Sequence, residues 1–123
     1  MDSRAPLAVT VKGTRSAIVV AAVGRIDMHT EHLWREQIED ACAENTTKRY
    51  VVVDLTGVAF LSIGAASLIL RAHYHCLHRG RLLRVAAPTG PALSTLQVTG
   101  VGGLVAVYRD LEEALEPAGR FQW

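Results

Sequence analysis

Residues 50–55 of this 123-residue sequence, YVVVDL, decide the fold because they are its strongest candidate for a buried strand. Their apolar, β-branched run is typical of a strand that is covered on both faces of a sheet. Extended backbone is expected to continue over residues 58–60, and a helical pattern then runs from about Ile63 to Arg79, where Gly80 stops it. A buried strand that passes directly into a long helix indicates an α/β fold.

Further strands and helices are expected on both sides of this unit. Because strands separated by helices form parallel pairs through right-handed crossovers, we expect a mostly parallel sheet with about four helices. The opening strand returns through a turn at Gly13 and is therefore expected to be an antiparallel edge strand. The expected strands are residues 7–11, 17–23, 50–55, 81–87 and 104–108, and the expected helices begin after Thr30, near Ile63, near Pro91 and after Asp110.

Length and composition indicate a single domain over residues 1–123, with a core at about 7–116 and flexible ends. Thirteen Lys and Arg residues against 12 Asp and Glu give a net charge of +1, which argues against binding to nucleic acid through a basic surface. No apolar run reaches the ~18 residues of a membrane span, and the N-terminus lacks the apolar core of a secretory signal. These features predict a cytoplasmic protein without membrane insertion.

Three blocks of the sequence carry a resemblance to a known family. Residues 54–66, DLTGVAFLSIGAA, lead from a strand through small residues into a helix. Residues 24–27, GRID, follow the second expected strand, and residues 96–115 join a Leu-x-x-x-Gly turn to a strand and a Glu-Glu-Ala-Leu ending. In this order and spacing, the blocks resemble the STAS domain of bacterial anti-sigma factor antagonists over about residues 7–116.

The resemblance implies a regulator that binds protein, with no enzyme activity and with no catalytic residue, metal or cofactor. The implied partner is an anti-sigma factor of the ATP-binding serine-kinase type, whose sequestration releases a sigma factor. Two other roles stay open, an accessory subunit of a membrane lipid or anion transporter and a scaffold of the stressosome type. The residues implied to contact the partner are Asp27, Thr30, Ser62, Ile63, Gly64, Ala65, Ala66 and Ser67.

The sequence departs from this family at the phosphorylation site. In the family pattern Asp-Ser-Ser-Gly, a partner kinase phosphorylates the second serine, but Gly64 stands there in this chain, or Ile63 if one deletion is allowed. Neither residue has a hydroxyl group, so no phosphorylation is expected at the family position. Ser62 is then either a helix N-cap or, like Thr56 and Ser67, a substitute acceptor.

Cysteine and histidine residues suggest two further chemistries. Cys42 and Cys76 are too few for a disulfide framework, but a redox change at them is one remaining means of control. His75 and His78 share one helix face, and His73 shares another with Cys76, but no carboxylate joins either pair. We therefore expect Cys76 in the core and the histidines in solvent, without a metal site.

Three other features have mainly structural interpretations. Asp54 ends a central strand like the phosphate acceptor of a receiver domain, but residues 9–14 lack the acidic pair that would hold magnesium. Trp34 and Trp123 are expected to be partly buried. The helix after Ser62 is apolar around most of its circumference, which indicates either deep packing or a docking face.

Overall fold

The computed structural model describes residues 7–44 and 46–116, so the predicted flexible ends lie outside the described residues. The chain forms one α/β domain with five strands and four α-helices. The strands are β1 (Leu7–Gly13), β2 (Ala17–Ile26), β3 (Tyr50–Leu61), β4 (Leu82–Ala86) and β5 (Ala106–Tyr108). The helices are α1 (Glu31–Ala43), α2 (Ile63–His78), α3 (Pro91–Val98), the short 3₁₀ helix η1 (Val101–Gly103) and α4 (Leu111–Leu115).

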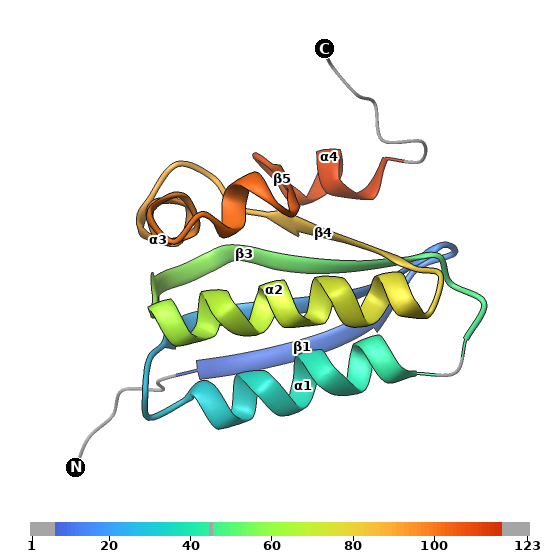
Figure 1. Cartoon of the computed structure of the whole chain (residues 1–123), viewed down its shortest axis with the longest axis horizontal. Coiled ribbons are helices and arrows are strands. Elements are labelled where there is room, and N and C mark those ends of the chain that lie inside the picture. The colour runs from blue at the N-terminus through green and yellow to red at the C-terminus, as the bar shows by residue number, and fades with distance from the viewer. Residues whose placement is uncertain (1–6, 45, 117–123) are drawn as a thin grey trace.

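The sheet has the strand order β1-β2-β3-β4-β5, so neighbours in the chain are also neighbours in the sheet. β1 is antiparallel to β2 and the other pairings are parallel, which confirms the predicted sheet and its edge strand. Successive right-handed crossovers in such a sheet fall on one face. The helices α1, α2 and α3 pack on that face, with α1 and α2 side by side, while α4 packs on the other (Figure 1).

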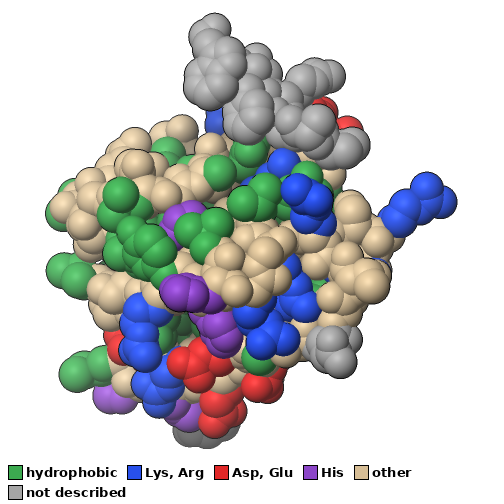
Figure 2. Space-filling view, turned by 45° about the vertical axis from the view of Figure 1, so that its right-hand side comes forward, with side chains coloured by type: hydrophobic (Ala, Val, Ile, Leu, Met, Phe, Trp, Pro, Cys, Tyr) green, Lys and Arg blue, Asp and Glu red, His purple; other side chains and the backbone are tan. Residues whose placement is uncertain are grey.

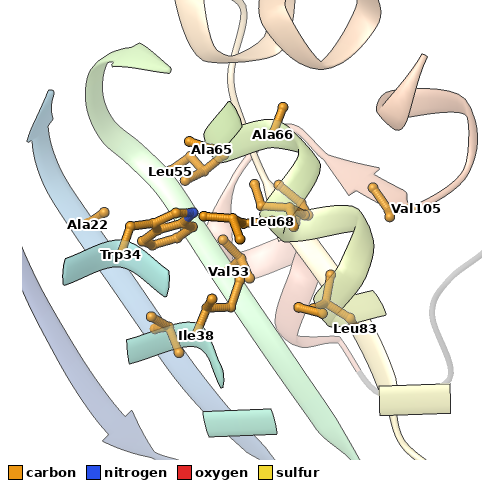
Figure 3. Close-up of a cluster of buried hydrophobic side chains, with 14 of the residues drawn as sticks. Ala22, Trp34, Ile38, Val53, Leu55, Ala65, Ala66, Leu68, Leu83 and Val105 are labelled. Atoms are coloured by element: carbon orange, nitrogen blue, oxygen red, sulfur yellow. The ribbon is translucent and has the colours of Figure 1, made fainter. Parts of the chain in front are cut away.

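One large hydrophobic core fills the space between the sheet and helices α1 and α2. Figure 3 shows Trp34 pointing from α1 into a cluster that includes Val53 and Leu55 of β3 and Leu68 of α2. Trp34 is 0% exposed, so the expectation of partial burial was wrong. The charged neighbours of Trp34 lie on other faces of α1, so their polarity does not indicate whether the face that carries Trp34 is buried. Trp123 lies outside the described residues.

Helix α2 is packed more deeply than an ordinary surface helix. Packing against the sheet, α1 and α3 explains most of its apolar circumference. Cys76 lies in the core and His75 and His78 are exposed, as predicted, whereas His73 is half-buried. The buried residues of α2 are Ala65, Ala66, Leu68, Ile69, Ala72 and Cys76.

Two strands differ in length from the expectation. β3 is one continuous strand that covers both segments predicted from the sequence, and it ends at Leu61, immediately before α2. β5 is shorter than the predicted strand 104–108, because Leu104 and Val105 still belong to the turn that closes η1. The chain enters η1 through Gly100, whose φ of 83° is readily accessible only to glycine.

A buried arginine holds the C-terminal end of α1. Arg81 was expected inside a strand, but it precedes β4, and its guanidinium donates hydrogen bonds to three backbone carbonyl oxygens. These acceptors belong to Cys42, Glu44 and Thr46, at and after the last turn of α1. A positive group there satisfies carbonyls that have no partner within the helix.

Arg84 of β4 holds the C-terminal end of α4, on the opposite face of the sheet, by donating hydrogen bonds to backbone carbonyl oxygens. Its Nη1 donates to the carbonyl oxygens of Ala114 and Glu116, at 3.0 and 2.7 Å. The guanidinium carbon also lies 4.0 Å from the ring centre of Tyr50 and 5.7 Å from that of Tyr108. Arg84 therefore joins α4 to three neighbouring strands.

Candidate functional site

The N-terminal end of α2 begins with a capped turn that also contacts α1. Ser62 Oγ accepts a hydrogen bond from Ala65 N at 3.0 Å, which confirms the predicted N-cap. The same hydroxyl donates to Glu31 Oε2 at 2.7 Å. Since Glu31 is the first residue of α1, this contact joins the N-terminal ends of the two helices.

The carboxylate of Glu31 occupies the space beside Gly64. A Cβ atom at Gly64 would lie only 2.6 Å from Glu31 Oε2 and 2.8 Å from Oε1. Glycine is therefore the residue that leaves room for the contact between Glu31 and Ser62. Glu31 was not among the predicted site residues, because the sequence gives no signal that these two helix ends meet.

The turn between β2 and α1 is held by Asp27 and Thr30. Thr30 occupies the N-cap position of α1, but its hydroxyl makes no cap bond, contrary to the prediction. Instead Thr30 Oγ1 donates to Arg25 O and accepts from Asp27 N, both at 2.9 Å. The Asp27 carboxylate accepts from His29 N and lies 3.7 Å from Arg25 Nε. Desolvation acts against ionisation, but hydrogen bonds from His29 and Thr30 and the His29 charge hold the pKa of Asp27 below its ordinary value.

Exposed apolar side chains occur in the segments that carry Ser62 and Glu31. Met28 is 78% exposed and Ile63 is 66% exposed, and Phe60 is also exposed while it stacks against the Arg25 guanidinium. They gather at one end of the sheet because Ile26 pairs with Leu61 where β2 and β3 both end. We call the set Met28, Glu31, Phe60, Ser62, Ile63, Gly64 and Ser67 the α2 entry surface.

The structure places the predicted partner-contact residues in two groups. Ile63 and Ser67 are exposed, and Ser62, Gly64 and Asp27 are half-buried, so they are available at or beside the α2 entry surface. The other three predicted residues were wrongly placed on the surface. Ala65 and Ala66 are 0% exposed because they form the inner face of α2 against the core, as Figure 3 shows, and Thr30 is buried by its turn.

The Asp-Leu-Thr-Gly segment has a structural role. Asp54 Oδ1 accepts hydrogen bonds from Thr56 N at 3.0 Å and from Thr56 Oγ1 at 2.7 Å. This local pairing accompanies a register shift between β2 and β3, where a Cβ atom on Gly57 would lie 2.9 Å from Val23 Cγ2. The motif therefore shapes the bulge that leads toward α2, and Asp54 is buried rather than presented as a phosphate acceptor.

The described residues show no metal centre and no membrane span. Over residues 7–44 and 46–116, no three His, Cys, Asp or Glu side chains are grouped closely enough to hold a metal ion. Within the same part of the chain, no helix combines the length and the apolar composition that a membrane crossing needs.

Comparison with known proteins gives one consistent family. Residues 8–114 match the STAS domain family. Rv2638, an assigned anti-anti-sigma factor of Mycobacterium tuberculosis, is 28% identical over 114 residues, which cover 93% of this chain and 77% of the relative. The anti-sigma-F factor antagonist RsfA of the same species is 28% identical over 109 residues, covering 89% and 85%. The crystal structure of an anti-sigma factor antagonist from Mycobacterium paratuberculosis has the same fold, with a TM-score of 0.80 at 24% identity over 89% of this chain and 91% of that one.

Proposed function

Because this chain belongs to the STAS domain family, we propose that it is an anti-sigma factor antagonist, which binds an anti-sigma factor and thereby releases a sigma factor. Two relatives that carry such names match about nine-tenths of the chain. The proposed activity is binding without catalysis, in the cytoplasm, and the proposed partner is an anti-sigma factor of the ATP-binding serine-kinase type.

The observation that carries the proposal is the exposed apolar part of the α2 entry surface. Met28 and Ile63 expose most of their area, and they lie close in the chain to Glu31 and Ser62, which make the polar contact. Large apolar side chains with a polar centre and rim are the composition of a protein-binding patch. Because Ala65 and Ala66 lie beneath this surface, they support it from the core and do not contact the partner.

We further propose that partner binding is not switched by phosphate at position 63 or 64. Ile63 and Gly64 have no hydroxyl, and the Glu31 carboxylate fills the space beside Gly64. Ser62 is a poor substitute acceptor because its hydroxyl already caps α2 and donates to Glu31. A phosphate on Ser62 would lie against this carboxylate and would be repelled by it.

The binding test compares two exposed apolar positions. Ile63→Arg should weaken binding to a purified serine-kinase anti-sigma factor from the same organism at least tenfold, because a charge replaces an apolar contact at the patch. The matched control is Val98→Arg on α3, since Val98 is 83% exposed and lies outside the α2 entry surface. Titration calorimetry gives both affinities, and melting curves should show that both variants stay folded.

Two outcomes would contradict the binding proposal. Equal affinities for the two variants would mean that the α2 entry surface does not contact the partner. Failure of the unmodified chain to bind any anti-sigma factor of the organism, together with co-purification with a membrane transporter, would favour the accessory-subunit role.

The phosphorylation test uses the cognate kinase, ATP and intact-mass measurement. The unmodified chain should take up no phosphate, whereas the double variant Glu31→Ala/Gly64→Ser should gain one, because the backbone at Gly64 does not have a positive φ and removal of the carboxylate makes room for the new side chain. Ser62→Ala serves as the control for phosphate at the neighbouring hydroxyl. Stoichiometric, kinase-dependent phosphate on Ser62 of the unmodified chain would overturn the unswitched mechanism.

A further inference from the structure

Two thiols meet where the C-terminal ends of α1 and α2 pack together. Cys42 lies in the last turn of α1 and Cys76 in the last turn of α2, and their sulfur atoms are 3.2 Å apart. Both are free thiols, and both side chains are completely buried. They are also the only cysteines in the sequence, so an intramolecular disulfide in this chain can only join these two residues.

The two sulfur atoms, which share a hydrogen bond, are close enough that a disulfide needs only a short further approach. A disulfide bond is about 2.05 Å long, so the sulfur atoms need to approach by only about one ångström. A movement of this size is within the reach of side-chain rotation and a small shift of two packed helices.

Two arginines lie beside Cys76, because the backbone N–H groups of Arg79 and Arg81 donate hydrogen bonds to Cys76 O at 2.9 and 2.8 Å. Its hydrogen bond with Cys42 lowers the pKa of Cys76; burial opposes this, and the positive charges of Arg81 and Arg79 lower the pKa further. Arg81 is held in place here, because its Nη1 donates to Cys42 O at 3.0 Å. The thiolate is the nucleophilic form of cysteine, so these charges favour attack by Cys76.

A groove between the two helices reaches the neighbourhood of the thiols. It has a volume of about 350 Å³, and Ala43, Ala72 and His75 are among its lining residues. Ala43 and His75 are the chain neighbours of the two cysteines, and Cys42 Sγ lies 3.8 Å from Ala72 O. The groove therefore brings a small oxidant to residues that adjoin both cysteines. Among the described residues, no third His, Cys, Asp or Glu side chain joins the two thiols in a group that could hold a metal ion.

We propose that Cys42 and Cys76 are a site of reversible oxidative modification, at which hydrogen peroxide converts the two thiols into a disulfide that ties α1 to α2. The Cys76 thiolate attacks one peroxide oxygen and breaks the O–O bond, and the released hydroxide takes up a proton to give water and a Cys76 sulfenic acid. The Cys42 sulfur then attacks the Cys76 sulfur, and the second oxygen leaves as water with the Cys42 proton. Two thiols and one peroxide thus give one disulfide and two waters.

The experiment treats the full chain with a small molar excess of hydrogen peroxide and then blocks free thiols in denaturant. We expect a mass loss of about 2 Da, disappearance of both thiols and a cross-linked peptide that contains residues 42 and 76. The melting temperature should rise by about 10 °C, because the cross-link restricts the unfolded chain. A phosphine reductant should reverse all of these changes.

The variants Cys42→Ala and Cys76→Ala separate the roles of the two thiols. Cys42→Ala should accumulate sulfenic acid on Cys76, a gain of about 16 Da, and Cys76→Ala should react at least tenfold more slowly. Similar rates in the two variants would overturn the assignment of Cys76 as the first nucleophile.

Two results with the unmodified chain would overturn the proposal as a whole, and they stay decisive even if a variant fails to fold. The first is survival of both thiols under peroxide that fully oxidises a cysteine peptide. The second is formation of only higher oxides or of dimers between chains, instead of the intramolecular link. None of these measurements requires the partner, so they test the thiol site separately from the proposed function.

Discussion

Helices α1 and α2 touch at both of their ends, and the two contacts differ in accessibility (Figure 1). At the N-terminal ends, Glu31 and Ser62 make a partly buried polar contact among exposed apolar side chains. At the C-terminal ends, Cys42 and Cys76 meet inside the core beside buried Arg81. The first contact is partly exposed to solvent, while both side chains of the second are fully buried. On the two proposals made above, the same pair of helices offers one contact for recognition and one for chemical modification.

The charges at the two ends are also opposite. Asp27 and Glu31 lie at the N-terminal end of α1, where the helix dipole is positive. At the far end, a groove of about 540 Å³ is lined by Lys48, Arg79 and Arg81 and by other residues of the same loops. Figure 2 shows Lys and Arg side chains gathered on the face toward the viewer, beside histidines and acidic groups. The favourable charges thus come from Glu31 in the first turn of α1 and from His75 and His78 in the last turn of α2.

The largest predicted effect belongs to the buried end. Arg81→Ala should lower the free energy of unfolding by about 3 kcal/mol, because buried Cys42 O and the partly buried carbonyl oxygens of two further residues lose a charged donor. Arg79→Ala is the matched control, since exposed Arg79 makes one bond, to Ala43 O, and its loss should cost less than about 1 kcal/mol. Urea unfolding measures both, and equal losses would mean that Arg81 is no more important than a surface charge.

A smaller effect is expected at the accessible end. Ser62→Ala should destabilise the fold by about 1 kcal/mol, because Ala65 N loses its cap and Glu31 loses its donor. Ser67→Ala is the control, since its exposed hydroxyl only donates to Ile63 O within the same helix. Thermal unfolding distinguishes the two variants. A neutral Ser62→Ala would show that water replaces the cap without loss.

The smallest predicted effect is at Gly64, where the effect of an alanine substitution on stability should change sign when Glu31 is removed. Gly64→Ala should destabilise the chain by about 0.5 kcal/mol, because its Cβ displaces the Glu31 carboxylate and breaks the bond to Ser62. In a Glu31→Ala background the same substitution should stabilise by about 0.5 kcal/mol, since alanine is the better helix former. A double-mutant cycle in urea measures this coupling. Additive effects would show that Glu31 does not depend on the space at Gly64.

The arrangement of strands and helices was predictable because apolar runs and their glycine and proline boundaries are local signals. Residues 50–55 became the centre of β3, and the cap residues Ser62 and Asp110 start their helices as expected. Thr30 was misjudged because its hydroxyl has a competing acceptor at Arg25 O, which only the folded turn supplies.

The site was less predictable because it depends on contacts between distant segments. The sequence identified the exposed residues Ile63 and Ser67, but an apolar helix does not reveal which alanines face inward, so Ala65 and Ala66 were misplaced. The sequence likewise does not show that Glu31 meets Ser62, because 31 residues separate them along the chain.

The sequential strand order has a consequence for how the chain is made. Each strand from β2 to β5 pairs with the strand that precedes it, so every new strand finds its partner already synthesised. The contacts that join neighbouring strands also close only short loops, which keeps the entropic barrier to pairing low. Nascent chains halted after β3 should therefore already hold the β1-β2-β3 sheet with α1 docked on it, while the ribosome still adds the remaining strands.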